Sequence, residues 1–267
     1  MLDYHAMPEL LAIYVEGETK TGKGAASEAI ANTLHDEGVS VYHAVAGDFF
    51  RRFTAIIRRD LALDEAAPLP ERDELTSIAT KLFENREAFS IDPALGDLQR
   101  PEISNCVSQL GELAIAQEAA VVWYEETVRQ AIDGGYQVLV MDGRNPRRHV
   151  EELDAEVRTI LDIYMTCDPE IAARRTWAAK SVTDPSHEQI SAEAAVVADR
   201  RQRDRERAEW PFHWPTEYFT LTDDATGFVE RSRQTGDNPP LPIVIDNSAL
   251  DLPTMTALVA QLTRDAL

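Results

Sequence analysis

The sequence predicts an α/β fold in which a parallel β-sheet is covered by helices on both faces. Short apolar runs alternate along the chain with longer segments whose apolar residues recur at helical spacing, as in strands joined by crossover helices. The first run, 11–15, leads into a glycine-containing loop and then into a helix from Ala25 onward. With 267 residues, 44% of them hydrophobic, the chain is long enough for one large domain over 1–267.

The loop after the first strand contains Gly-x-x-x-x-Gly-Lys, from Gly17 to Lys23. Between a strand and a helix, this arrangement wraps an anion with backbone N–H groups, and the helix N-terminus adds about half a positive charge. Lys23 is then able to reach the outer phosphates of a nucleotide. The alternative, a plain turn with a solvated lysine, is disfavoured by the strand and the helix on either side.

A second strand is predicted at 39–45, where apolar residues alternate and Gly38 ends the preceding helix. It delivers 47–52 to the edge of the sheet that holds the glycine loop, because the carboxyl ends of parallel strands share an edge and ligands bind there. Arg51 is therefore a candidate ligand for a second anion. A solvated arginine at the start of a helix fits the sequence equally well.

The remaining elements follow from apolar periodicity, with proline favoured at a helix start and glycine at a helix end. They are helices at 71–89, 103–132 (bent near Gly111), 169–179, 191–208 and 251–266, and strands at 136–141, 159–165 and 243–245, with a loop at 180–190. Residues 210–242 begin with several aromatic residues, so we interpret them as an insert whose aromatic side chains pack on the core. A role in stacking on a base is the alternative.

The strand at 136–141 ends directly at Asp142-Gly143-Arg144. At this edge of the sheet, Asp142 would orient a magnesium-bound water or a substrate hydroxyl, and Arg144 would bind a phosphate through paired N–H groups. The alternative is an Asp-Gly turn with a surface arginine.

The helix at 191–208 carries several arginines on one face. Arg200, Arg203, Asp204 and Arg207 recur at i, i+3, i+4 and i+7 and therefore lie on the same side of the helix. Such arginines repel one another unless an anion lies opposite, so we expect this face to bind phosphate. The alternative is a solvated face with ion pairs.

Composition limits the partners of the chain. A net charge of −21 disfavours binding to nucleic-acid polymers or anionic membranes. No apolar run approaches the ~20 residues that span a bilayer, and the first ten residues lack a signal-peptide pattern. Cys106 and Cys167 offer neither a disulfide framework nor zinc spacing, and their apolar neighbours predict buried, reduced thiols. We expect a cytoplasmic monomer.

Six segments, in their order along the chain, resemble motifs of the cytidylate kinase family of P-loop nucleoside monophosphate (NMP) kinases. They are the glycine loop 17–25, Gly-Asp-Phe-Phe-Arg at 47–51, Glu-Ile-Ser-Asn at 102–105 with Ser108, Asp-Gly-Arg at 142–144, Arg-x-x-x-Asp-x-x-Arg at 200–207, and Ile-Val-Ile-Asp-Asn-Ser at 243–248. The resemblance spans most of the chain. It implies a P-loop nucleoside-kinase-like sheet with an NMP-binding insert at about 52–110 and a mobile arginine-bearing lid at about 174–207.

What the resemblance implies is ATP-dependent phosphorylation of CMP or dCMP to the diphosphate, with Mg²⁺ bound through ATP and water rather than directly by the protein. The loop residues would bind ATP, namely Gly17, Glu18, Thr19, Lys20, Thr21, Gly22, Lys23, Gly24 and Ala25. The acceptor nucleotide would be bound by Arg51, Arg100, Asp142, Arg144, Asn145, Asp204 and Arg207. The catalytic residues would be Lys23, Arg200 and Arg207.

Three features depart from the family's pattern. Ala25 replaces the usual Thr or Ser of the loop, Gln99-Arg100 is offset by one from the family's base-contacting arginine, and 210–242 is longer than expected. Two other functions therefore stay open. One is a related kinase for another small acceptor, and the other is a nucleotide-binding protein that has lost catalysis and serves as a sensor or partner-binding module.

Overall fold

The structure, a computed structural model, confirms the predicted α/β fold. It describes residues 9–64, 67–84, 98, 100–104, 106–153, 157–182, 184–206, 215, 218–220 and 241–267. Within these ranges, six strands form one parallel sheet in the order β2-β3-β1-β4-β6-β5. The strands are β1 Leu10–Gly17, β2 Val41–Val45, β3 Val138–Asp142, β4 Val157–Thr166, β5 Phe219–Thr220 and β6 Ile243–Asp246.

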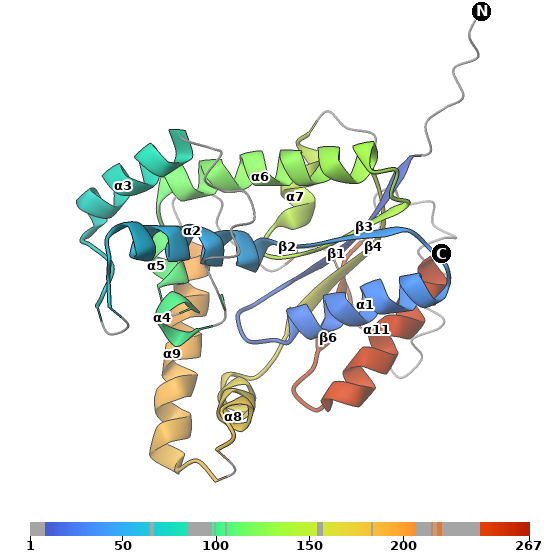
Figure 1. The fold of residues 1–267 in the computed structure, drawn as a ribbon. Helices are drawn as coiled ribbons and strands as arrows, with labels where there is room; N and C mark the ends of the chain where they lie inside the picture. The colour runs from blue at the N-terminus through green and yellow to red at the C-terminus, as the bar shows by residue number, and fades with distance from the viewer. Residues whose placement is uncertain are drawn as a thin grey trace, which may run out of the picture.

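Helices cover both faces of the sheet, as predicted (Figure 1). α1 (Lys23–Asp36) and α11 (Leu252–Ala266) pack together on one face, and α6 (Ala114–Asp133) and α7 (Pro146–Glu151) lie on the other. The other helices are α2 Ala46–Asp60, α3 Arg72–Glu84, α4 Pro101–Ser104, α5 Val107–Gly111, α8 Pro169–Ala179 and α9 His187–Glu206. Of these, α8 and α9 pack against each other beyond the carboxyl end of β4 (Figure 1).

The central strand β1 explains why both faces need helices. Successive side chains of a strand point to opposite faces. Ile13 and Val15 are buried in the core formed with α1 and α11, whereas Ala12 and Tyr14 are buried in the core formed with α2 and α6. A strand that is apolar on both sides is the mark of a sheet between two helical layers.

Several element boundaries differ from the prediction. The helix expected at 103–132 is three helices, α4, α5 and α6. The break between α5 and α6 lies at Leu113, which adopts an extended backbone directly after the bend near Gly111. The loop expected at 180–190 is shorter, since α9 already begins at His187. The helices α2 and α7 were not assigned from the sequence, since α2 follows β2 without an intervening loop and α7 spans only Pro146–Glu151.

Part of the prediction falls outside the described residues. This applies to the end of the helix expected at 71–89 and to nearly all of the aromatic segment 210–242, from which β5 pairs with β6. Cys106 and Cys167 are buried free thiols. None of the helices within the described ranges is long and apolar enough to cross a membrane.

Two carboxyl groups, the buried Asp162 and the half-buried Glu16, lie under α7 on the face of the sheet that also holds Tyr14. The backbone N–H of Arg147 donates to Oε1 of Glu16 at 3.1 Å, and its guanidinium donates to Oδ2 of Asp162 at 2.7 Å. Burial raises the pKa of Glu16 to about 8, and the negative charge of Asp162 acts in the same direction. Burial also raises the pKa of Asp162 to about 6, although Arg147 opposes this shift. The guanidinium of Arg147 thus pairs with Asp162 and, at 2.7 Å, with Glu151, while Glu16 accepts a backbone N–H and holds a proton near neutral pH.

This pair predicts a pH-dependent stability. The folded protein holds a proton on Glu16 between its ordinary pKa of 4.5 and about 8, whereas the unfolded chain releases it. The free energy of unfolding should therefore fall as pH rises through this window, since the folded state binds more protons. The substitution Glu16→Gln should flatten this dependence, as measured by urea unfolding from pH 5 to pH 8. An exposed control, Glu9→Gln, should keep the wild-type slope, and a Glu16→Gln slope equal to wild type would contradict the assignment.

Candidate active site

The candidate site lies at the carboxyl edge of the sheet, where three neighbouring strands end together. Val15 of β1, Val45 of β2 and Asp142 of β3 are in register. The segments that follow them therefore meet at one edge. These segments are the glycine loop, the start of α2, and Gly143-Arg144, the three motifs that the sequence assigned to a single edge.

The glycine loop turns sharply away from the sheet because β1 and β4 approach closely at its start. Gly17 has a φ of +137°, and a Cβ added there would lie 2.2 Å from the carbonyl oxygen of Met165 on β4. Only glycine fits this position. Lys20 and Gly22 also have positive φ values, of 60° and 86°. Alternation of left-handed residues in a short loop is the backbone form that builds anion-binding concavities.

Lys23 opens α1 and is half-buried beside the loop. Its Nζ donates to the carbonyl oxygen of Glu18 at 2.6 Å, and Oγ1 of Thr21 donates to the same oxygen at 2.9 Å. Burial lowers the pKa of Lys23 to about 7. The positive charges of Arg144 and Arg200 add to this lowering, while Asp142 and Asp204 oppose it. Groups from β3, from the segment that follows it and from α9 therefore act on one lysine of α1.

A second lysine extends this positively charged region. Burial lowers the pKa of Lys20, and the charges of Arg200, Lys180 and Arg51 act in the same direction against Glu193. Arg51, on the first turns of α2, pairs with Asp48 at 2.7 Å. Arg51, Arg144 and Arg200 thus come from three distant parts of the chain and act electrostatically on the lysines of one loop.

Asp142 ends β3 and is buried next to α1. Its Oδ2 accepts a hydrogen bond from Oγ of Ser27 at 3.2 Å, and Nε2 of His43 lies 3.1 Å from the same hydroxyl. Burial raises the pKa of Asp142, while the charge of Lys23 and the hydrogen bond from Ser27 oppose the rise. The sequence analysis missed Ser27, although it lies one helical turn beyond Lys23 on the loop's own helix.

Ser27 offers a hydroxyl beside the end of the loop, where Gly24 and Ala25 bring none. Gly24 has no side chain, and a Cβ added to it would lie 3.8 Å from Oδ2 of Asp142. Ala25 packs against the apolar core between α1 and α11. The side-chain oxygens at this end of the loop therefore belong to Asp142 and Ser27. Among the described residues, no group of three or more His, Cys, Asp or Glu side chains could hold a metal ion.

The arginine-bearing helix α9 lies against the site through a buried ion pair. Nε of Arg144 lies 2.5 Å from Oδ2 of Asp204, whose side chain is buried. Two residues predicted to bind the acceptor nucleotide thus contact each other. Arg203 differs from the expectation that it faces phosphate, because it pairs with Asp199 and, at 3.3 Å, with Glu112.

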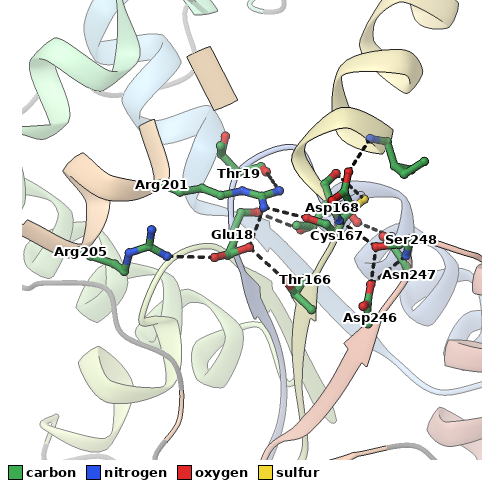
Figure 2. A network of polar contacts seen from close by, with 12 residues as sticks. Glu18, Thr19, Thr166, Cys167, Asp168, Arg201, Arg205, Asp246, Asn247 and Ser248 are labelled. Atoms are coloured by element: carbon green, nitrogen blue, oxygen red, sulfur yellow. Dashed lines mark hydrogen bonds and ion pairs between the residues drawn. The ribbon is translucent and has the colours of Figure 1, made fainter. Parts of the chain in front are cut away.

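Arg201 is a site residue that the sequence analysis missed. Its guanidinium donates to the carbonyl oxygens of Cys167 at 2.7 Å and Thr19 at 3.1 Å, and pairs with Glu18 at 2.9 Å (Figure 2). It continues the buried stripe of α9, whose members are Ile190, Ala194, Val197, Arg201 and Asp204. Arg201 and Asp204 follow the apolar residues of this stripe at helical spacing, and this pattern in the sequence could have indicated that they form buried ion pairs.

The other predicted site residues have different surroundings. Arg100 is exposed and lies 3.5 Å from Glu102 on α4. Asn145 directly follows Arg144 and begins α7 in a left-handed conformation, with a φ of 56°. Arg207 lies outside the described residues.

The chain matches the model of a known protein family. The model of the family described as cytidylate kinase matches residues 13–230, which include the glycine loop, Asp142-Gly143-Arg144 and α9. No curated protein matches the chain.

The lowered pKa of Lys23 predicts proton uptake on anion binding. With a pKa of about 7, Lys23 is largely neutral at pH 7.5, and a bound polyphosphate should raise its pKa and charge it. Calorimetric titration with inorganic triphosphate in two buffers of different ionisation enthalpy should then give different heats. Lys23→Met should abolish the difference, and Lys81→Met, an exposed change on α3, should keep it. Equal heats for the wild type in both buffers would contradict the prediction.

Proposed function

The chain belongs to the cytidylate kinase family, and on this premise we propose that it transfers the γ-phosphate of ATP to CMP or dCMP. The family implies a kinase that acts on nucleotides. The observation that carries the finer proposal is the convergence of Arg144 and Arg200 on Lys23, since the charges of both arginines act on this lysine at the carboxyl edge of the sheet. Such an arrangement is unfavourable in the absence of an anion and is relieved when phosphates bind between the cations.

The donor ATP would lie on the glycine loop. The N–H groups of residues 17–25 and the start of α1 offer fixed dipoles to its phosphates, and Lys23 would leave the carbonyl of Glu18 to contact them. Phosphoryl transfer requires in-line positioning and neutralisation of charge on the equatorial oxygens rather than covalent help. Arg200, with Arg207, would supply that neutralisation, and a single arginine of this kind is worth roughly 10³ to 10⁵ in rate.

The acceptor would bind opposite the loop. Arg51 and Arg144 suit its phosphate, because a guanidinium matches phosphate oxygens with paired N–H groups. Asp204 fixes Nε of Arg144 at 2.5 Å and would leave the outer guanidinium nitrogens for phosphate. Arg100, Asp142, Asn145 and Asp204 would contact the base and sugar, and Arg207 the acceptor phosphate.

Magnesium accompanies ATP in this chemistry, and the residues beside the loop fit an ion held through water. Asp142 and Ser27 present carboxylate and hydroxyl oxygens within 3.2 Å of each other, and hard oxygen ligands are those that Mg²⁺ prefers. When bound, the ion would neutralise part of the phosphate charge. Asp142 and Ser27 would orient its water ligands, in agreement with a loop whose Gly24 and Ala25 bring no hydroxyl.

A coupled assay with ATP and a panel of nucleoside monophosphates tests the proposal. We expect turnover of CMP or dCMP above the other acceptors, and a loss of at least about 10³-fold in kcat for Lys23→Met and Arg200→Ala with an unchanged circular-dichroism spectrum. Arg203→Met, on the same helix as Arg200, should retain activity. Turnover of a different acceptor would favour the related-kinase alternative, and ATP binding without any turnover would favour a nucleotide sensor.

The position of Ser27 gives a separate prediction for magnesium. Removing its hydroxyl in Ser27→Ala should raise the Mg²⁺ concentration needed for half-maximal ATP binding, because Asp142 loses the partner that orients it. A shift of roughly tenfold is expected for a lost partner of this kind. Calorimetric ATP titrations at several Mg²⁺ concentrations measure it. Ser40→Ala serves as the control, and an Mg²⁺ requirement equal to wild type would exclude a role for Ser27.

A further inference from the structure

The glycine loop is held from outside by two side chains that come from distant parts of the chain. Nη2 of Arg201 donates to the carbonyl oxygen of Thr19 at 3.1 Å, and Nδ2 of Asn247 donates to that of Thr21 at 2.6 Å. A trans peptide group points its C=O and N–H in opposite directions. The N–H groups of Lys20 and Gly22 therefore point away from the two clamping side chains. A loop that surrounds a phosphate needs its N–H groups aimed in this way, so these contacts support a preformed loop.

Arg201 also ties this loop to α9 through a buried counter-charge. The carboxylate of Glu18 is 8% exposed and the guanidinium of Arg201 is 6% exposed, with Oε2 and Nη1 2.9 Å apart. Glu18 additionally accepts from Oγ1 of Thr166 at 3.0 Å and lies 3.3 Å from Arg205 (Figure 2). Because Arg201 further donates to Cys167 at the end of β4, its position is fixed from three sides. Its neighbour in the sequence is Arg200, whose charge acts on Lys20 and Lys23.

We propose that Arg201, held by Glu18, is a positioning residue that fixes the phosphate loop and α9 in one arrangement before nucleotide binds. The loop N–H groups and Arg200 are then directed at the same anion. The part of this inference that concerns turnover depends on the proposed kinase function. The part that concerns the loop does not, because it rests on contacts among residues of the chain itself.

Hydrogen–deuterium exchange of the full-length, ligand-free protein tests the loop directly. In Arg201→Met, the amides of 18–24 should exchange roughly tenfold to hundredfold faster, the range expected when charge-assisted hydrogen bonds are lost. The milder Glu18→Gln should show a smaller increase over the same peptides. Arg203→Met makes the same substitution two residues along α9, where the side chain is 42% exposed, and should leave the loop unchanged. If Arg201→Met does not fold, Glu18→Gln alone decides the result.

The double variant separates a coupled pair from two independent residues. In Arg201→Met, the buried carboxylate of Glu18 loses its closest guanidinium, so adding Glu18→Gln should slow loop exchange again instead of accelerating it. With ATP and CMP, Arg201→Met should lower kcat/KM for ATP about 10²-fold, the effect of a misplaced catalytic group.

The outcomes are distinguishable. Loop exchange equal to wild type in both Arg201→Met and Glu18→Gln, or additive acceleration in the double variant, would overturn the positioning role of Arg201. Wild-type protein that phosphorylates no nucleoside monophosphate would instead overturn the proposed kinase function, and the exchange data would still decide the role of Arg201.

Discussion

Accumulated positive charge at the carboxyl edge of the sheet is the constraint on which the candidate site depends. Arginines from three further segments act on the lysines of one loop there, and burial, with the charges of Arg144 and Arg200, lowers the pKa of Lys23 to about 7. The chain has 26 basic and 47 acidic residues, so such a region must be built against the overall charge. Two carboxylates reduce its cost: Asp204 contacts Arg144, and Glu18 contacts Arg201 and Arg205. Ion pairing keeps the arginines in place while anion-binding groups remain directed at the edge.

The backbone prepares the same edge independently of charge. Gly17 allows β1 to turn close to β4, where an added Cβ would lie 2.2 Å from the carbonyl oxygen of Met165, and this turn starts the loop. The strand register brings the ends of β1, β2 and β3 level, so the segments that follow these strands lie next to one another. Contacts from Arg201 and Asn247 then hold the loop carbonyls on the outside. The backbone geometry and the charged groups therefore independently place the candidate site at the carboxyl edge of the sheet.

Local patterns predicted the sheet and the glycine loop from the sequence, because apolar periodicity and Gly-x-x-x-x-Gly-Lys are properties of short segments. They also predicted that Arg51 and Arg144 belong at one edge, since strand ends determine it. The partners of α9 could not be predicted in this way. Arg203 was expected on the phosphate side and instead pairs with Glu112, while Arg201, which helical spacing did not select, contacts the loop. These outcomes depend on how α9 packs, and spacing along one helix does not contain that information.

The two glutamates at the end of β1, Glu16 and Glu18, differ in the charged groups that they contact. Glu16 accepts the backbone N–H of Arg147, whose guanidinium pairs with Asp162 and Glu151. Burial raises the pKa of Glu16 to about 8, so a proton neutralises it near pH 7. Glu18, two residues further along, contacts two guanidinium groups and a hydroxyl. A proton neutralises Glu16 without connecting it to another element. The arginines that pair with Glu18 also join it to α9. The loop is therefore connected to the rest of the site by charge pairing, and the strand behind it is secured by packing.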